Sequence, residues 1–95
     1  MCRNIRVLHH FEPPTTPEEI RAAALQYVRK VSGIREPSQA DAAAFEKAIA
    51  DVAKVTSRVL DALTTPRSAA RTREGEKRKA QARWENRKSR IVASR

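Results

Sequence analysis

The sequence has little glycine, few aromatic residues and a single cysteine, and each shortage excludes a class of protein. Its 95 residues include two glycines, four aromatic residues and one cysteine. Two isolated glycines exclude a glycine-rich phosphate-binding loop. One cysteine, Cys2, excludes an intramolecular disulfide and fits a reducing compartment. Four aromatic residues leave a core of Val, Ile, Leu and Ala, so we expect one thin domain.

Long hydrophobic runs are also missing. No segment reaches the roughly 18 consecutive apolar residues that a membrane-spanning helix needs. The first residues, MCRNIRVLHH, lack the apolar centre of a secretion signal. We therefore expect no transmembrane segment and a cytoplasmic location.

The net charge of +9 is concentrated at one end of the chain. Residues 1–66 contain nine Lys or Arg against eight Asp or Glu, a balance of +1. Residues 67–95 contain eleven against three, a balance of +8. The sequence thus predicts a nearly neutral helical domain at 1–66 and a basic tail at 67–95. Such asymmetry is typical of a chain with a polyanionic partner.

The residues that start and end helices predict an all-α fold. Residues 1–15 alternate too briefly for a strand and then meet Pro13 and Pro14, so we expect a short extended segment. A first helix is predicted at 16–33, because Thr16 and Glu19 form a capping box and Gly33 suits a left-handed helix end. The tail is rich in helix formers, and we expect it to be helical or conditionally ordered.

A second helix is predicted at 38–63, with Ser38 as its N-cap. Its apolar residues recur in steps of three and four from Phe45 to Leu63, and the short connection predicts an antiparallel hairpin. A lone hairpin buries little surface, so something must cover the rest of the stripe. The N-terminal segment with Ile5, Val7, Leu8 and Phe11 is one candidate. A second copy of the chain is the other, which makes a homodimer through this helix an alternative function.

Two sequence segments resemble a known bacterial family. They are the opening MCRNI at residues 1–5 and the string LQYVRKVSG at residues 25–33. Together with the pattern of apolar residues in the second helix, they closely resemble domain of unknown function 2277 over about residues 1–64. The resemblance implies a compact helical domain and supplies no substrate or reaction. Because MCRNI looks like a signature of that family, Cys2, Arg3 and Asn4 become candidate functional residues.

The basic tail gives the strongest indication of a partner. Its guanidinium groups match phosphates in charge and in two-pronged geometry. Trp84 lies among them and provides an indole that stacks on exposed bases. We therefore predict an accessory protein that contacts RNA or DNA; the alternatives are an anionic membrane, an acidic protein, or a solubilising tail without a fixed partner. The residues expected to contact nucleic acid are Arg71, Arg73, Lys77, Arg78, Lys79, Arg83, Trp84, Arg87, Lys88 and Arg90.

Catalysis has little support in the sequence. Arg3 and Arg6 favour a reactive thiolate at Cys2, but no acid–base partner is fixed beside it. Cys2, His9 and His10 do not have the spacing of a metal site. We predict no catalytic residue, metal or cofactor and infer no small-molecule substrate. Enzyme activity stays open and is not favoured, with thiol or redox chemistry at Cys2 as a further alternative.

Overall fold

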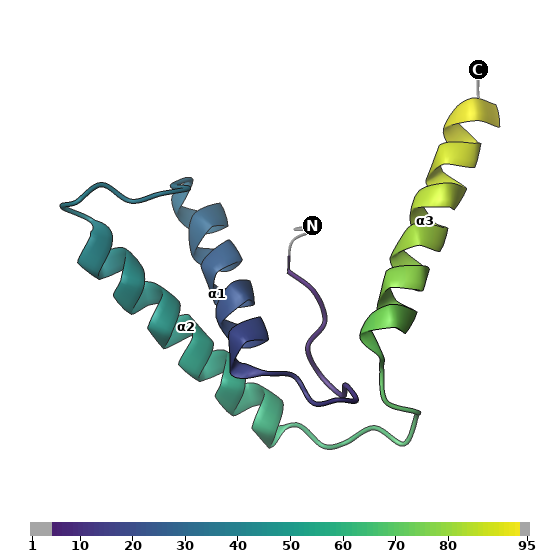
Figure 1. The fold of residues 1–95 in the computed structure, drawn as a ribbon, viewed down its shortest axis with the longest axis horizontal. Coiled ribbons are helices and arrows are strands. Elements are labelled where there is room, and N and C mark those ends of the chain that lie inside the picture. Colours follow the sequence, from purple (N-terminus) through teal and green to yellow (C-terminus); the bar gives the residue numbers. More distant parts are fainter. Residues whose placement is uncertain (1–4, 94–95) are drawn as a thin grey trace.

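Three helices and no β-strand make up residues 5–93, the part of the chain that this computed structural model describes. The helices are α1 (Pro17–Ser32), α2 (Ala42–Ala62) and α3 (Arg73–Ala93). The predicted all-α fold is therefore confirmed. Helices α1 and α2 run in opposite directions and pack as a hairpin, while α3 stands apart from both (Figure 1).

Both ends of α1 follow from local sequence. The hydroxyl of Thr16 accepts the N–H of Glu19 at 3.2 Å, and the Glu19 carboxylate accepts the N–H of Thr16 at 3.0 Å. This reciprocal arrangement is the predicted capping box. At the other end, Gly33 has φ 71° and donates its N–H to the carbonyl of Arg29 at 2.9 Å. A left-handed residue ends the helix here because it turns the chain away while still satisfying a terminal carbonyl.

The start of α2 differs from the prediction. Asp41, and not Ser38, occupies the N-cap position, and its side chain caps no backbone N–H. Ser38 instead lies in a turn, where its carbonyl accepts the N–H of Asp41 at 3.0 Å and its hydroxyl lies 3.3 Å from the Asp41 carboxylate. Two polar residues three positions apart compete for the same role, and the turn that joins them delays the helix to Ala42.

The hydrophobic core lies between α1 and the first half of α2. Ala24 and Val28 of α1 pack with Phe45 and Ile49 of α2, and each is at most 8% exposed. Burying a Val, Ile or Phe side chain contributes about 1.5–3 kcal/mol, so this small cluster is the main reason that the hairpin holds together. The half-buried residues around it are Leu25, Ile34, Ala48, Val52 and Ala53.

The N-terminal segment does not cover the rest of the α2 stripe. Ile5 and Val7 are 39% and 51% exposed, and Leu8 and Phe11 do not belong to the core cluster. The segment passes instead towards the start of α3 (Figure 1). Of the two candidates for covering the stripe, the described part of the N-terminal segment, from Ile5 onward, does not fill that role.

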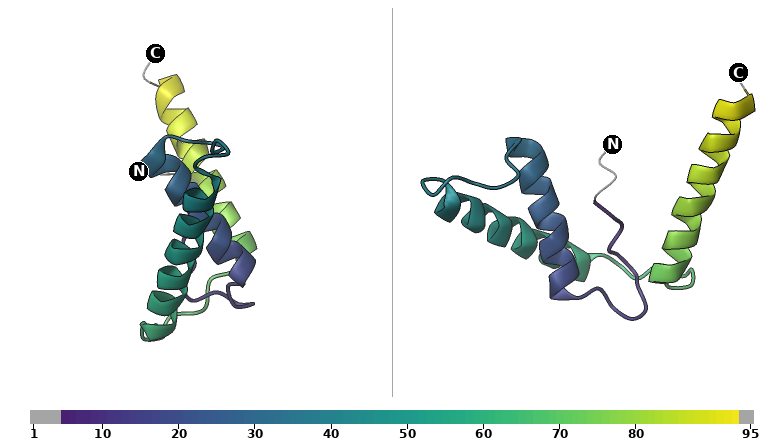
Figure 2. Two further views of the ribbon diagram at one scale, coloured as in Figure 1. Left: turned by 90° about the vertical axis from the view of Figure 1, so that its left-hand side faces the viewer. Right: turned by 45° about the horizontal axis from the view of Figure 1, so that its top comes forward.

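Helix α3 leaves the hairpin in a thin, open arrangement. The chain measures 50 × 40 × 17 Å. The left view of Figure 2 looks at the molecule from the side and shows how thin it is. Thr72 caps the start of α3, because its hydroxyl accepts the N–H of Gly75 at 2.9 Å. No helix among the described residues is long and apolar enough to span a bilayer.

Candidate functional site

The first contact that positions α3 is a short backbone pairing between two distant segments. The N–H of Arg71 donates to the carbonyl of His10 at 2.7 Å, and the N–H of Glu12 donates to the carbonyl of Arg71 at 2.9 Å. The pairing forms an isolated parallel bridge between Phe11 and Arg71. We call the two segments, residues 9–14 and 68–73, the terminal clasp.

His10 reinforces the clasp with both its backbone and its ring. Its φ of 63° is in the left-handed region, which histidine adopts more readily than most residues. Its Nε2 atom lies 2.8 Å from the carbonyl of Ser68. Because a carbonyl only accepts, Nε2 must carry the proton in this contact. The neighbouring carbonyl of His9 accepts a hydrogen bond of 2.7 Å from the guanidinium of Arg71.

Arg73 makes the most contacts in the clasp. Its guanidinium binds both carboxylate oxygens of Glu19 at 2.7 and 2.9 Å. It also donates to the carbonyls of Pro13 and Pro14 at 2.8 and 3.2 Å, and it lies 5.3 Å from the centre of the Phe11 ring. All three nitrogens of this guanidinium therefore donate hydrogen bonds to other groups of the same chain.

The electrostatics of the Arg73–Glu19 pair follow from this geometry. The hydrogen bonds from Arg73, followed by the one from the Thr16 N–H, lower the pKa of Glu19 from 4.5 to about 2. The hydrogen bonds to Glu19, in turn, raise the pKa of Arg73. Both groups therefore stay charged at neutral pH, and the pair ties the first residue of α3 to the first turn of α1.

Beyond the clasp, α3 exposes a dense set of cations. Residues 77–90 contain seven Lys or Arg against a single acid, Glu85, and all of them are exposed. Lys79 lies 3.6 Å from Glu76, and the other six make no ion pair with any described side chain. The cations of this α3 surface are Lys77, Arg78, Lys79, Arg83, Arg87, Lys88 and Arg90.

Trp84 occupies the middle of the α3 surface. Its side chain is 52% exposed although it is the largest apolar group in the chain. Residues three and four positions away on a helix are its neighbours, which places Ala80 one turn before it and Arg87 and Lys88 one turn after it. The half-exposed indole thus has two cations one turn after it, and Ala80 and Gln81 one turn before it.

The predicted nucleic-acid residues therefore fall into two groups. Arg71 and Arg73 lie in the terminal clasp and bond to the chain itself, while the other eight lie on the α3 surface. Sequence reasoning missed the clasp, because the two arginines resemble their neighbours in every local respect. The candidate residues Cys2, Arg3 and Asn4 lie outside the described residues.

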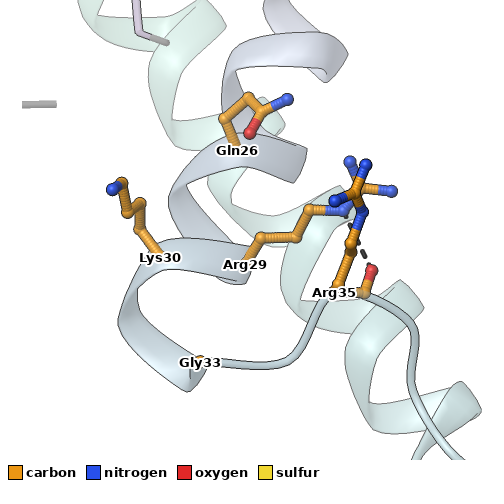
Figure 3. A pocket seen from close by; sticks show the side chains of 5 residues that line it. All are labelled: Gln26, Arg29, Lys30, Gly33 and Arg35. Atoms are coloured by element: carbon orange, nitrogen blue, oxygen red, sulfur yellow. Dashed lines mark hydrogen bonds between the residues drawn. The ribbon is translucent and has the colours of Figure 1, made fainter. Parts of the chain in front are cut away.

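A second cationic feature lies at the end of α1 (Figure 3). It is an open pocket of about 400 Å³ lined by Gln26, Arg29, Lys30, Gly33 and Arg35. The Arg29 guanidinium donates to the Arg35 carbonyl at 3.0 Å, and Lys30 extends to the other side. Cations near a helix C-terminus stabilise its partial negative charge, which accounts for their placement.

The described residues offer no grouping suited to metal binding. No group of three His, Cys, Asp or Glu side chains converges anywhere in residues 5–90. The rings of His9 and His10 have centroids 6.2 Å apart and are tilted by 41°. Their backbone carbonyls accept hydrogen bonds from Arg71 in the terminal clasp. In this structure the two histidines therefore help to hold the clasp together.

Comparison with models of known protein families shows which family the chain belongs to. A family model described as “Uncharacterized conserved protein (DUF2277)” matches residues 1–79. The chain belongs to this family. No curated protein and no solved structure matches the chain. The family match extends past the predicted limit near residue 64, so it includes the whole terminal clasp and the first turns of α3. Most of the α3 surface, including Trp84, lies beyond it.

Proposed function

We propose that this protein binds RNA or DNA through the α3 surface, without sequence preference. The observation that carries the proposal is the combination of charge and exposure in residues 77–90, where seven cations face a single acid and six of the cations lack an ion-pair partner among the described side chains. A cationic helix that packed against its own domain would be neutralised internally. Apart from the contact of its first residue, Arg73, with Glu19, this helix stands clear of α1 and α2.

The clasp supports the proposal by giving the cations a fixed base. Arg73 anchors the first turn of α3 to α1, so the helix leaves the domain in a defined direction. A helix that is already ordered loses less conformational entropy on binding than a disordered tail. Arg71 and Arg73 are therefore anchoring residues in this proposal, and the phosphate contacts belong to the residues from Lys77 onward.

Trp84 favours nucleic acid over other polyanions. An acidic protein or an anionic membrane is attracted to charge, but an exposed indole between cations adds stacking on bases. Membrane-binding helices instead carry a broad apolar face. On α3 the described residues opposite and beside Trp84 are mostly charged or small.

The salt dependence of binding tests the proposal. Full-length protein is titrated with duplex DNA and with single-stranded RNA at several salt concentrations. Contacts to about six phosphates predict a slope of log affinity against log salt near −5 for duplex DNA. The triple variant Arg83→Gln, Arg87→Gln, Lys88→Gln should lose about half of that slope. No measurable binding by the unaltered protein near 0.15 M salt would refute the proposal.

A matched control separates a specific surface from total charge. The variant Lys30→Gln, Arg35→Gln, Lys54→Gln removes the same three charges from exposed positions of the hairpin. Its slope should stay close to that of the unaltered protein. Equal losses in the two variants would mean that net charge alone drives the association.

A further inference from the structure

The cationic pocket at the end of α1 has no part in the proposed function. Arg29 and Lys30 come from the last turn of the helix, and Arg35 comes from the loop that follows it. Residues 26–35 contain these three cations and no acid. Two segments of the chain thus place three positive side chains around one open volume of about 400 Å³.

No carboxylate neutralises this charge. Among residues 5–90, neither Arg29 nor Lys30 nor Arg35 forms an ion pair with an acidic side chain, although Glu36 directly follows the last of them. The end of α1 attracts cations, but its partial charge of about −0.5 offsets less than one of the three. Like charges gathered without a counter-ion repel one another, so an anion between them is favoured.

The two arginines of the pocket present hydrogen-bond donors to it. The Arg29 guanidinium donates through Nε to the Arg35 carbonyl at 3.0 Å, which fixes its direction and leaves its terminal nitrogens without a partner among the described residues. The Arg35 side chain makes no hydrogen bond among those residues, and it extends to the same side of the pocket as the Arg29 guanidinium (Figure 3). Guanidinium groups with open N–H donors suit the oxygens of a phosphate.

Gln26 and Gly33 complete the pocket in different ways. Gln26 lies three and four positions before Arg29 and Lys30, so it shares their side of the helix and adds an amide. Gly33 has no side chain, and a Cβ at this position would meet no atom within 4 Å. The backbone there is open to the approach of a ligand.

We infer that this pocket binds a dianionic phosphate group, either free phosphate or the terminal phosphate of a small phosphorylated molecule. Such a group carries a charge of about −1.5 to −2 at neutral pH and has three acceptor oxygens. Three cations less the partial charge of the helix end leave about +2.5, which matches a dianion. Each phosphate of a nucleic-acid backbone carries a single charge and matches less well.

The pocket is separate from the α3 surface, and none of its lining residues belongs to α3. Glu19, which holds the start of α3, lies in the first turn of α1. Gly33 lies 14 positions further along the chain, which is about 20 Å along a helix. The inference therefore does not depend on nucleic-acid binding, and either can fail without the other.

An NMR titration of the nitrogen-15-labelled full chain tests the inference. Sodium phosphate is added while sodium chloride keeps the ionic strength constant. The two glycines of the chain provide separate reporters, Gly33 in the pocket and Gly75 at the start of α3. The amide of Gly33 should shift along a curve that saturates in the millimolar range, and that of Gly75 should not follow it. A second titration with ribose 5-phosphate separates the two sources, because tighter binding than that of phosphate indicates a phosphorylated molecule and weaker binding indicates free phosphate.

Matched variants show whether the pocket is responsible. Arg35→Gln should weaken phosphate binding about tenfold, since it removes a charged donor, and the absence of a hydrogen bond from this side chain should leave the helix content unchanged by circular dichroism. Lys30→Gln should also weaken binding. The controls Arg58→Gln and Lys54→Gln remove the same charges from exposed positions of α2 and should leave binding unchanged. A Gly33 shift that does not saturate, or equal losses in the pocket variants and their controls, would overturn the inference.

Discussion

The guanidinium of Arg73 and the carboxylate of Glu19 meet across 54 positions of sequence, through two hydrogen bonds of 2.7 and 2.9 Å. Glu19 also closes the capping box of α1 with Thr16. One carboxylate therefore stabilises the start of one helix and holds the start of another. The hairpin and the basic helix are coupled at this residue.

Two substitutions at Glu19 should separate its two roles. Glu19→Gln keeps a side chain that can close the capping box but loses the charge that pairs with Arg73. Glu19→Ala loses both. We expect stability in the order unaltered, Glu19→Gln, Glu19→Ala, measured by urea denaturation at neutral pH. If Glu19→Gln is as stable as the unaltered protein, the ion pair makes no contribution.

The same carboxylate predicts a pH dependence. Hydrogen bonds from Arg73, and then from Thr16, lower the pKa of Glu19 from 4.5 to about 2. A group whose pKa is lower when folded adds stability above its unfolded pKa and loses it as the pH falls towards the folded value. The stability difference between the unaltered protein and Glu19→Gln should therefore be constant at neutral pH and shrink between pH 4.5 and pH 2. An undiminished difference at pH 2 would contradict this assignment.

The accuracy of sequence reasoning divides between local and distant contacts. The Thr16–Glu19 capping box and the left-handed Gly33 were predictable, because each involves residues within one helical turn. The start of α2 was less so, because Ser38 and Asp41 are both good caps and their own turn decides between them.

The candidate site shows the same division more sharply. Charge and exposure of the α3 surface follow from composition and from the scarcity of apolar residues there. That Arg73 would bond internally does not, since its partners Glu19, Pro13 and Phe11 lie more than fifty positions away. In the sequence, the ten basic or aromatic candidates could not be told apart. Arg71 and Arg73 differ from the rest only because the folded N-terminal segment passes beside them and accepts their hydrogen bonds.

Gly33 should tolerate substitution poorly for reasons of backbone alone. A Cβ at this position would meet no atom within 4 Å, but the φ of 71° is unfavourable for residues with a side chain. We expect Gly33→Ala to lower the free energy of unfolding by about 1 kcal/mol or slightly more. Gly33→Asn should cost less, because asparagine tolerates the left-handed region. Thermal or urea denaturation of both variants measures this, and equal costs would point to a cause other than φ.

The division of the arginines between clasp and surface predicts unequal effects on binding. Arg83→Gln removes an unpaired cation of the α3 surface, so the salt slope for duplex DNA should become less steep by about 0.9. Arg71→Gln removes a group already bonded to the carbonyl of His9, so the slope should change little. Titration of both variants at several salt concentrations checks the difference. A comparable change at Arg71 would mean that the clasp opens when nucleic acid binds.

Trp84 should distinguish single strands from duplexes. It is the only tryptophan in the chain, so intrinsic fluorescence reports on it alone, and it is 52% exposed. Stacking on an unpaired base contributes about 1–3 kcal/mol. We expect single-stranded RNA to quench the fluorescence and Trp84→Leu to weaken RNA binding by that amount, with a smaller loss for duplex DNA, whose bases are already stacked. Trp84→Phe keeps an aromatic face and should retain part of the affinity. Equal losses on single strands and duplexes would show that the indole contributes through packing and not through stacking on bases.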